Sequence, residues 1–127
     1  MRKVLAVILS LMLGASMVYA EAFSKKGKAG PLKVEYSSAK DLTRGMNTIF
    51  IDIKDGTKTV ENAKVTFQLF MPEMPGMPYM EKITEAVYKD GRYETTTMIM
   101  MPGTWQVRIA IETKDGKKFM MKSSVII

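Results

Sequence analysis

The sequence contains neither cysteine nor histidine among its 127 residues. Without cysteine there is no disulfide bond, no thiolate nucleophile, no thiolate metal ligand and no cysteine to carry a lipoprotein anchor. Without histidine there is no imidazole to act as a general base or as a zinc ligand. A small domain of this composition must be stabilised by hydrophobic burial alone.

These absences also argue against catalysis. Serine and threonine have no imidazole to activate them as nucleophiles. A pair of carboxylates could still act as acid and base. The acidic candidates fall mostly on the expected solvent faces of strands and show no sign of convergence: Asp52, Glu61, Glu85, Glu94 and Glu112. We expect the protein not to be an enzyme.

The first twenty residues have the layout of a secretory signal peptide. Arg2 and Lys3 form a positive start, residues 4–13 are apolar, and Val18-Tyr19-Ala20 carries small residues at its outer positions. Cleavage after Ala20 would give a periplasmic or otherwise extracytoplasmic protein without a stable membrane anchor. The alternative is an uncleaved N-terminal anchor, although the apolar run is short for a membrane span.

The remaining chain is long enough for one domain. Residues 21–30, EAFSKKGKAG, are interpreted as a flexible lead-in, and residues 31–127 as the folded domain. Loss of Arg2 and Lys3 lowers the net charge from +6 to +4. The lysines of the lead-in could attract anionic lipid or an acidic partner, or could simply form a solvated tail. Nucleic acid is not an expected partner.

Beyond residue 32 the apolar residues recur with a period of two, which indicates β-strands. The clearest alternating runs and three weaker candidates cover residues 32–36, 49–54, 64–69, 83–88, 93–101, 105–112 and 118–126. Turn signals separate them. Lys-Asp-Gly occurs at 54–56, 89–91 and 114–116, and Pro102-Gly103 forms a fourth break. Asp-Gly favours tight hairpins, whereas a calcium loop would concentrate more carboxylates.

Seven short strands with no helical segment predict an antiparallel β-sandwich of immunoglobulin type, without the disulfide of antibody domains. Trp105 is expected to anchor the core, and contact between its indole and a copper ion is a minor alternative. No internal repeat of solenoid length is evident.

Ten methionines follow residue 20, and strand parity sorts them. Met71, Met101 and Met121 continue inward series and are expected in the core, where thioethers fill irregular gaps. Met98, Met100 and Met120 have the outward parity of their strands. Met74, Met77 and Met80 fall in the segment MPEMPGMPYM of residues 71–80.

The prolines of this segment exclude a helix and favour polyproline II, whose three-residue turn would align the methionines along one edge. Backbones ~9 Å apart would then keep neighbouring sulfurs from sharing an ion. A shared site would need the chain to fold back, and Gly76 is where it could bend. Thioethers are soft, neutral ligands that select Cu(I), or by analogy Ag(I), over zinc or calcium. The candidate ligands are Met71, Met74, Met77, Met80, Met98 and Met100.

Two other interpretations of these methionines stay open. They could pack over one open end of the sandwich, or they could form an adaptable surface for a partner protein. The protein would then be a non-catalytic interaction module.

Two stretches resemble the YtkA-like family of small exported bacterial proteins. The first is AKVTFQLFMPEMPGMP of residues 63–78, a strand that runs into a Met-Pro loop. The second, residues 91–107, contains Gly-x-Tyr at 91–93, an alternating strand, and Met-x-Gly-x-Trp at 101–105. With Asp55-Gly56, the resemblance covers roughly residues 32–112.

The resemblance implies an immunoglobulin-like domain outside the cytoplasm, found alongside heavy-metal efflux components and related to a module linked with copper-oxidase assembly. An envelope transporter or an oxidase-assembly protein would be the partner. Unlike many relatives, this chain has no histidine near the loop, so a site would consist of methionine alone.

Overall fold

The computed structural model describes residues 22–127, so the predicted signal peptide lies outside the described residues. The described chain is all strand and turn, in nine strands. Within it there is no helix long and apolar enough to cross a bilayer. The all-β prediction is therefore confirmed.

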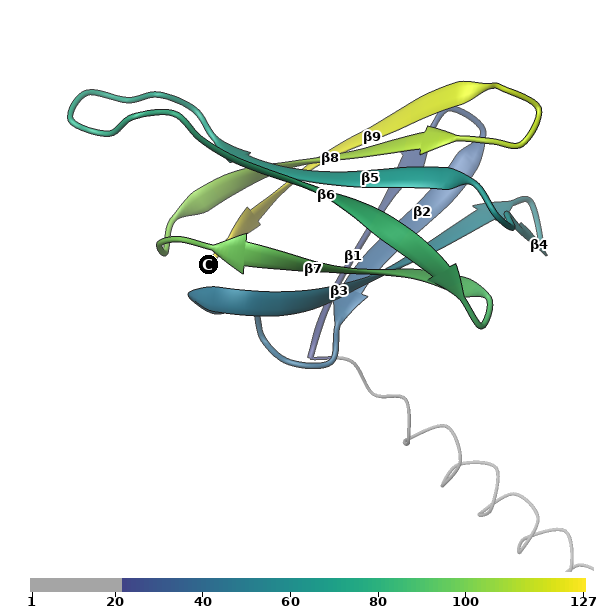
Figure 1. Ribbon diagram of the computed structural model, residues 1–127, viewed down its shortest axis with the longest axis horizontal. Helices are drawn as coiled ribbons and strands as arrows, with labels where there is room; N and C mark the ends of the chain where they lie inside the picture. The colour runs from purple at the N-terminus through teal and green to yellow at the C-terminus, as the bar shows by residue number, and fades with distance from the viewer. Residues whose placement is uncertain (1–21) are drawn as a thin grey trace, which may run out of the picture.

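The strands pair in one antiparallel path, β1-β2-β3-β7-β6-β5-β8-β9, with β4 added to β3. Their bounds are β1 Phe23–Ala29, β2 Leu32–Ser38, β3 Gly45–Asp55, β4 Lys58–Thr59, β5 Lys64–Met71, β6 Met80–Lys89, β7 Arg92–Ile99, β8 Thr104–Glu112 and β9 Lys118–Ile126. The path folds into two layers (Figure 1). We call the layer of β1, β2, β3 and β7 sheet A, and the layer of β5, β8 and β9 sheet B.

Strand β6 belongs to both sheets. Residues 80–86 pair with β5 in sheet B, and Val87, Tyr88 and Lys89 pair with β7 in sheet A. In immunoglobulin domains one sheet has the order A-B-E-D and the other contains C, F and G. The first sheet corresponds to the order β2, β3, β7 and the end of β6. The second sheet corresponds to β5, β8 and β9. The predicted sandwich is confirmed.

The structure has two strands more than the seven expected, β1 and the two-residue β4. The interpretation of residues 21–30 as a flexible lead-in is wrong for residues 23–29, which pair with β2 along their whole length. Gly27 explains why. A Cβ at this position would lie 2.6 Å from the Met121 sulfur, so the bare backbone of β1 packs directly against β9. The lysines on either side of Gly27 give no indication of this contact in the sequence.

The core lies between the sheets and consists mainly of the inward rows of β2, β3, β5, β7, β8 and β9. The largest fully buried side chains are Trp105, Tyr36, Tyr93 and Phe67. Trp105 anchors the core as predicted, and its Nε1–H donates to the Met101 carbonyl at 2.9 Å. Strand parity therefore identified the interior correctly.

Tyr93 ties the segment before β5 to the core. Its hydroxyl donates to the Val60 carbonyl at 2.7 Å and accepts the Ala63 N–H at 3.0 Å, while its ring packs 5.0 Å from that of Tyr88. One buried hydroxyl thus satisfies two backbone groups of an irregular connection.

We predict that Tyr93→Phe lowers the free energy of unfolding by about 1–3 kcal/mol, because it leaves Val60 and Ala63 without their partner. Tyr88→Phe is the matched control, since no hydrogen bond is found for the Tyr88 hydroxyl within residues 22–127. Urea unfolding of both variants measures the difference. Equal destabilisation by the two would contradict this role for the Tyr93 hydroxyl.

Burial raises the pKa of Tyr36 and of Tyr93 above the ordinary value of 10.0. Above about pH 10 these groups ionise in the unfolded chain but stay protonated in the folded one, so the free energy of unfolding should fall. Below that pH their contribution is intact. In Tyr36→Phe/Tyr93→Phe this alkaline loss should be smaller, and unfolding measured between about pH 8 and pH 11 tests it.

Candidate functional site

The methionine-proline segment forms the tip of the β5–β6 hairpin, which projects beyond the rest of the sandwich (Figure 1). The expectation of a straight polyproline II segment, with its methionines along one edge, is therefore wrong. Two backbone hydrogen bonds close the tip, from Met74 N to Met77 O at 3.0 Å and from Met77 N to Met74 O at 2.8 Å. The chain folds back on itself between these two residues.

The turn consists of Pro75 and Gly76, with Gly76 at φ +81°. Proline followed by a residue of positive φ is the type II arrangement, in which glycine carries no steric penalty. The bend thus occurs at the glycine that a shared site would require. The preference of Pro75-Gly76 for a tight turn therefore outweighs the preference of the neighbouring prolines for an extended backbone.

The four methionines are symmetric about this turn, so folding pairs them. Met71 lies opposite Met80 at the end of the β5–β6 ladder, and Met74 lies opposite Met77 at the tip. Cβ atoms of directly opposite residues are ~4.5–5.5 Å apart. Two flexible thioethers at that spacing can reach a common point, which the straight segment would have prevented.

Burial differs among the four methionines. Met71 is 2% exposed, and a Cβ on Gly103 would lie 2.9 Å from its methyl carbon, so it belongs to the core. Met77 and Met80 are half-buried against the edge of the core. Met74 is 47% exposed. The accessible sulfur atoms of the hairpin are therefore those toward its tip.

An aromatic stack supports the base of the hairpin. The ring of Tyr79 lies 6.2 Å from that of Phe70 on β5, and the Arg108 guanidinium lies 4.5 Å above the Phe70 ring. Beside them Gln68 donates to Glu81 at 2.6 Å. These contacts fix the outer face of the hairpin to sheet B.

Met98 lies near the end of β7 in sheet A, and Met100 directly follows that strand. Both are exposed, at 39% and 37%, as their parity predicted. Met98 lies directly opposite Met46 of β3, which is 62% exposed. Sequence reasoning did not associate Met46 with this cluster, because the pairing depends on the register between two strands that are distant in sequence.

The remaining methionines agree with parity. Met121 is buried, Met101 is half-buried against the core, and Met120 is 49% exposed on the outer face of β9. Within residues 22–127 no three acidic side chains converge in a way that could hold a metal ion. The thioether pairs are thus the notable donor groups of the described chain.

The family model of the YtkA-like proteins matches residues 26–110, more than half of the chain. The protein therefore belongs to the YtkA-like family. The match begins within β1 and ends within β8, so it includes the hairpin and both sheets. No curated protein and no solved structure is significantly similar to the chain.

We predict that Gly76→Ala strains the hairpin tip by about 1 kcal/mol, because alanine is disfavoured at positive φ. Amide exchange of Met74 and Met77, whose N–H groups close the tip, should speed up several-fold. Gly76→Asn should be tolerated better.

Gly56→Ala is the matched control, since Gly56 also has positive φ, +64°. It lies in the turn between β3 and β4, where an added Cβ would meet no neighbouring atom. It should leave exchange at Met74 and Met77 unchanged. If Gly76→Ala leaves that exchange unchanged too, the tip does not depend on the glycine.

Proposed function

We propose that this protein is an exported, non-catalytic domain that binds a soft monovalent cation, Cu(I) or Ag(I), through the β5–β6 hairpin. The observation that carries the proposal is the direct opposition of Met74 and Met77 at a hydrogen-bonded tip. Met80 is the next thioether along the chain, and it is half-buried at the same hairpin.

The donor chemistry supports the choice of ion. A chain without cysteine or histidine offers soft ligands only as thioethers, and thioethers select Cu(I) over zinc, magnesium or calcium. Two sulfur atoms on one ion lie within about 5 Å of each other, given metal–sulfur bonds of ~2.3 Å in thiolate sites. The spacing of opposed side chains permits this approach.

Not all six methionines considered from the sequence suit one site. Met71 is enclosed in the core, Met98 lies on β7 opposite Met46, and Met100 follows the end of β7. Met74 and Met77 are therefore proposed as the ligands, with Met80 as the additional donor. Of these, Met74 is exposed, whereas Met77 and Met80 are half-buried against the core.

The proposed cellular role is supported by the signal sequence expected at residues 1–20 and by what the family resemblance implies. An extracytoplasmic domain with a weak, neutral ligand set suits transient delivery of the ion to a partner, such as an envelope transporter or an oxidase-assembly protein. A projecting hairpin gives such a partner access to the bound ion (Figure 1).

The second candidate function is a protein-interaction module. It is favoured by two exposed side chains of the same hairpin, Tyr79 at 49% and Met74 at 47%. Aromatic and methionine side chains are enriched at the centres of protein interfaces. In this alternative the thioethers contact a protein and bind no ion.

The test is a competition titration of the full chain with Cu(I) or Ag(I). The wild type should bind about one ion more than Met74→Leu/Met77→Leu, because leucine preserves the volume and removes the sulfur. Adding Met80→Leu should remove any residual binding at the hairpin. Affinity should change little between about pH 5 and pH 8, since thioethers need no deprotonation.

Met46→Leu/Met120→Leu is the matched control, because it removes two exposed thioethers from two different sheets. It should bind as the wild type does. Equal binding by the wild type and the hairpin variant, with both folded, would exclude the hairpin site and favour the interaction module.

A further inference from the structure

A row of three lysines crosses the outer face of sheet A at the end away from the hairpin. Lys28 of β1 lies directly opposite Lys33 of β2, and Lys33 lies directly opposite Lys54 of β3. All three side chains are exposed. We call them the lysine row.

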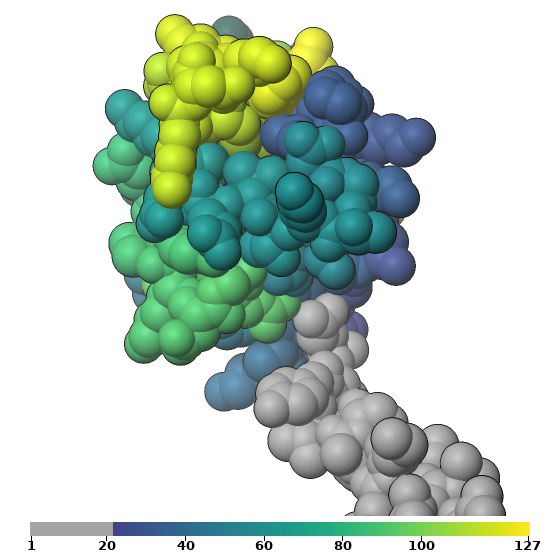
Figure 2. Space-filling view, turned by 90° about the vertical axis from the view of Figure 1, so that its right-hand side faces the viewer, coloured from purple at the N-terminus to yellow at the C-terminus, as the bar shows by residue number. Residues whose placement is uncertain are grey.

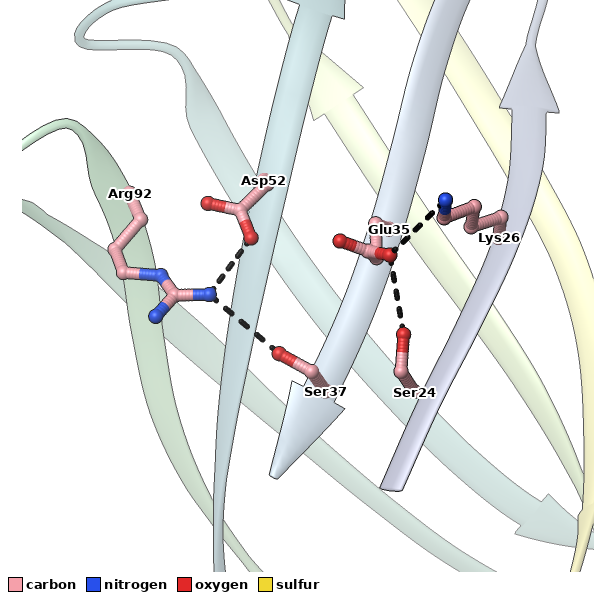
Figure 3. A network of polar contacts seen from close by, with 6 residues as sticks. All are labelled: Ser24, Lys26, Glu35, Ser37, Asp52 and Arg92. Carbon is pink, nitrogen blue, oxygen red and sulfur yellow. Dashed lines mark hydrogen bonds and ion pairs between the residues drawn. The ribbon is translucent and has the colours of Figure 1, made fainter. Parts of the chain in front are cut away.

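The acidic residues of this face have other partners (Figure 3). Glu35 accepts from Ser24 at 3.1 Å and lies 3.8 Å from the ammonium of Lys26, and Asp52 accepts from Arg92 at 2.7 Å. Within residues 22–127 no ion pair is found for any member of the lysine row. The carboxylates of this face are therefore engaged by Lys26 and Arg92 and not by the lysine row.

The row borders an open groove of about 410 Å³. Its lining includes the three lysines of the row together with Lys26, Glu35 and Asp52. The groove volume is within the usual range for small-ligand sites. Figure 2 looks onto one end of the sandwich, where the first strands, in purple, form the right-hand rim and are uncovered in this view.

Like charges placed directly opposite in a sheet are destabilising. Strands ~4.8 Å apart put three ammonium-bearing side chains within a span of about 10 Å. A multiply charged anion can bridge such groups, and lysine binds phosphate as a point charge. A ligand with only one carboxylate would carry too little charge to compensate three lysines.

We propose that the lysine row is a binding site for a phosphate group, either of a free phosphate-bearing anion or of a lipid headgroup. This site is independent of the thioether hairpin. Ligand binding would relieve the repulsion that the folded chain otherwise retains, so the ligand should stabilise the fold.

The test compares the full-length wild type with Lys28→Gln/Lys33→Gln/Lys54→Gln. The control is Lys114→Gln/Lys118→Gln/Lys122→Gln, which makes the same change in net charge at exposed lysines of β9 and the turn before it. One arm titrates inorganic pyrophosphate and records calorimetric binding and the shift in Tm. The other arm measures sedimentation with phosphatidylglycerol vesicles, with phosphatidylcholine vesicles as the neutral reference.

The wild type and the control should bind, more weakly as salt increases. The row variant should bind the vesicles roughly 100-fold more weakly, at about 1 kcal/mol for each lysine, and pyrophosphate at least about tenfold more weakly. Row-dependent binding of pyrophosphate identifies a free anion as the source. Row-dependent binding of vesicles alone identifies the headgroup.

The single variant Lys33→Gln removes the central charge with the least change to the fold. It should weaken binding about fivefold, and without ligand its Tm should not fall, because a repulsive neighbour is lost. The proposal is overturned if neither probe binds the wild type, or if the row variant and the control lose the same affinity.

Discussion

Trp105, Tyr36, Tyr93 and Phe67 are buried between two sheets that no disulfide joins. Burial of each large apolar side chain contributes about 1.5–3 kcal/mol. A slip of one residue in any strand would turn its inward row toward water. The inward row therefore fixes the register of the whole sandwich, and it leaves the outward row free of constraint from the core. The lysine row depends on that freedom, because its exposed side chains are not needed for the interior.

Strand β6 connects the sandwich to the hairpin. It keeps its alternation of half-buried and exposed residues along its full length while it passes from sheet B to sheet A. The hairpin tip is thus continuous with β6. One part of β6 is held by pairing in sheet B and the other by pairing in sheet A. The Tyr79–Phe70 contact adds a lateral support. Ligands carried on such an extension are held more rigidly than ligands on an irregular loop.

The seven main strands and most of the core could be predicted because each depends on parity within a single segment. The two-residue β4 has too short a pattern to detect. Strand β1 escaped prediction because its inward row contains Gly27, whose meaning appears only when Met121 packs against it. The pairing of Met46 with Met98, like the lysine row, required the register between distant segments. The tip of the hairpin required a choice between two local tendencies, and the Pro75-Gly76 turn overrode the extended preference of proline.

The two proposed sites place opposite demands on electrostatics, and the fold separates them. A chain of net positive charge repels a cation, whereas the lysine row needs that charge. The hairpin projects from one end of the sandwich, while β3 carries Lys54 toward the other end, where β4 follows (Figure 1). Interactions between exposed charges are largely screened beyond about 8–10 Å at moderate salt. In the proposed function, neutral thioethers at the tip would bind a cation through sulfur coordination, and the lysines at the far end would add little repulsion.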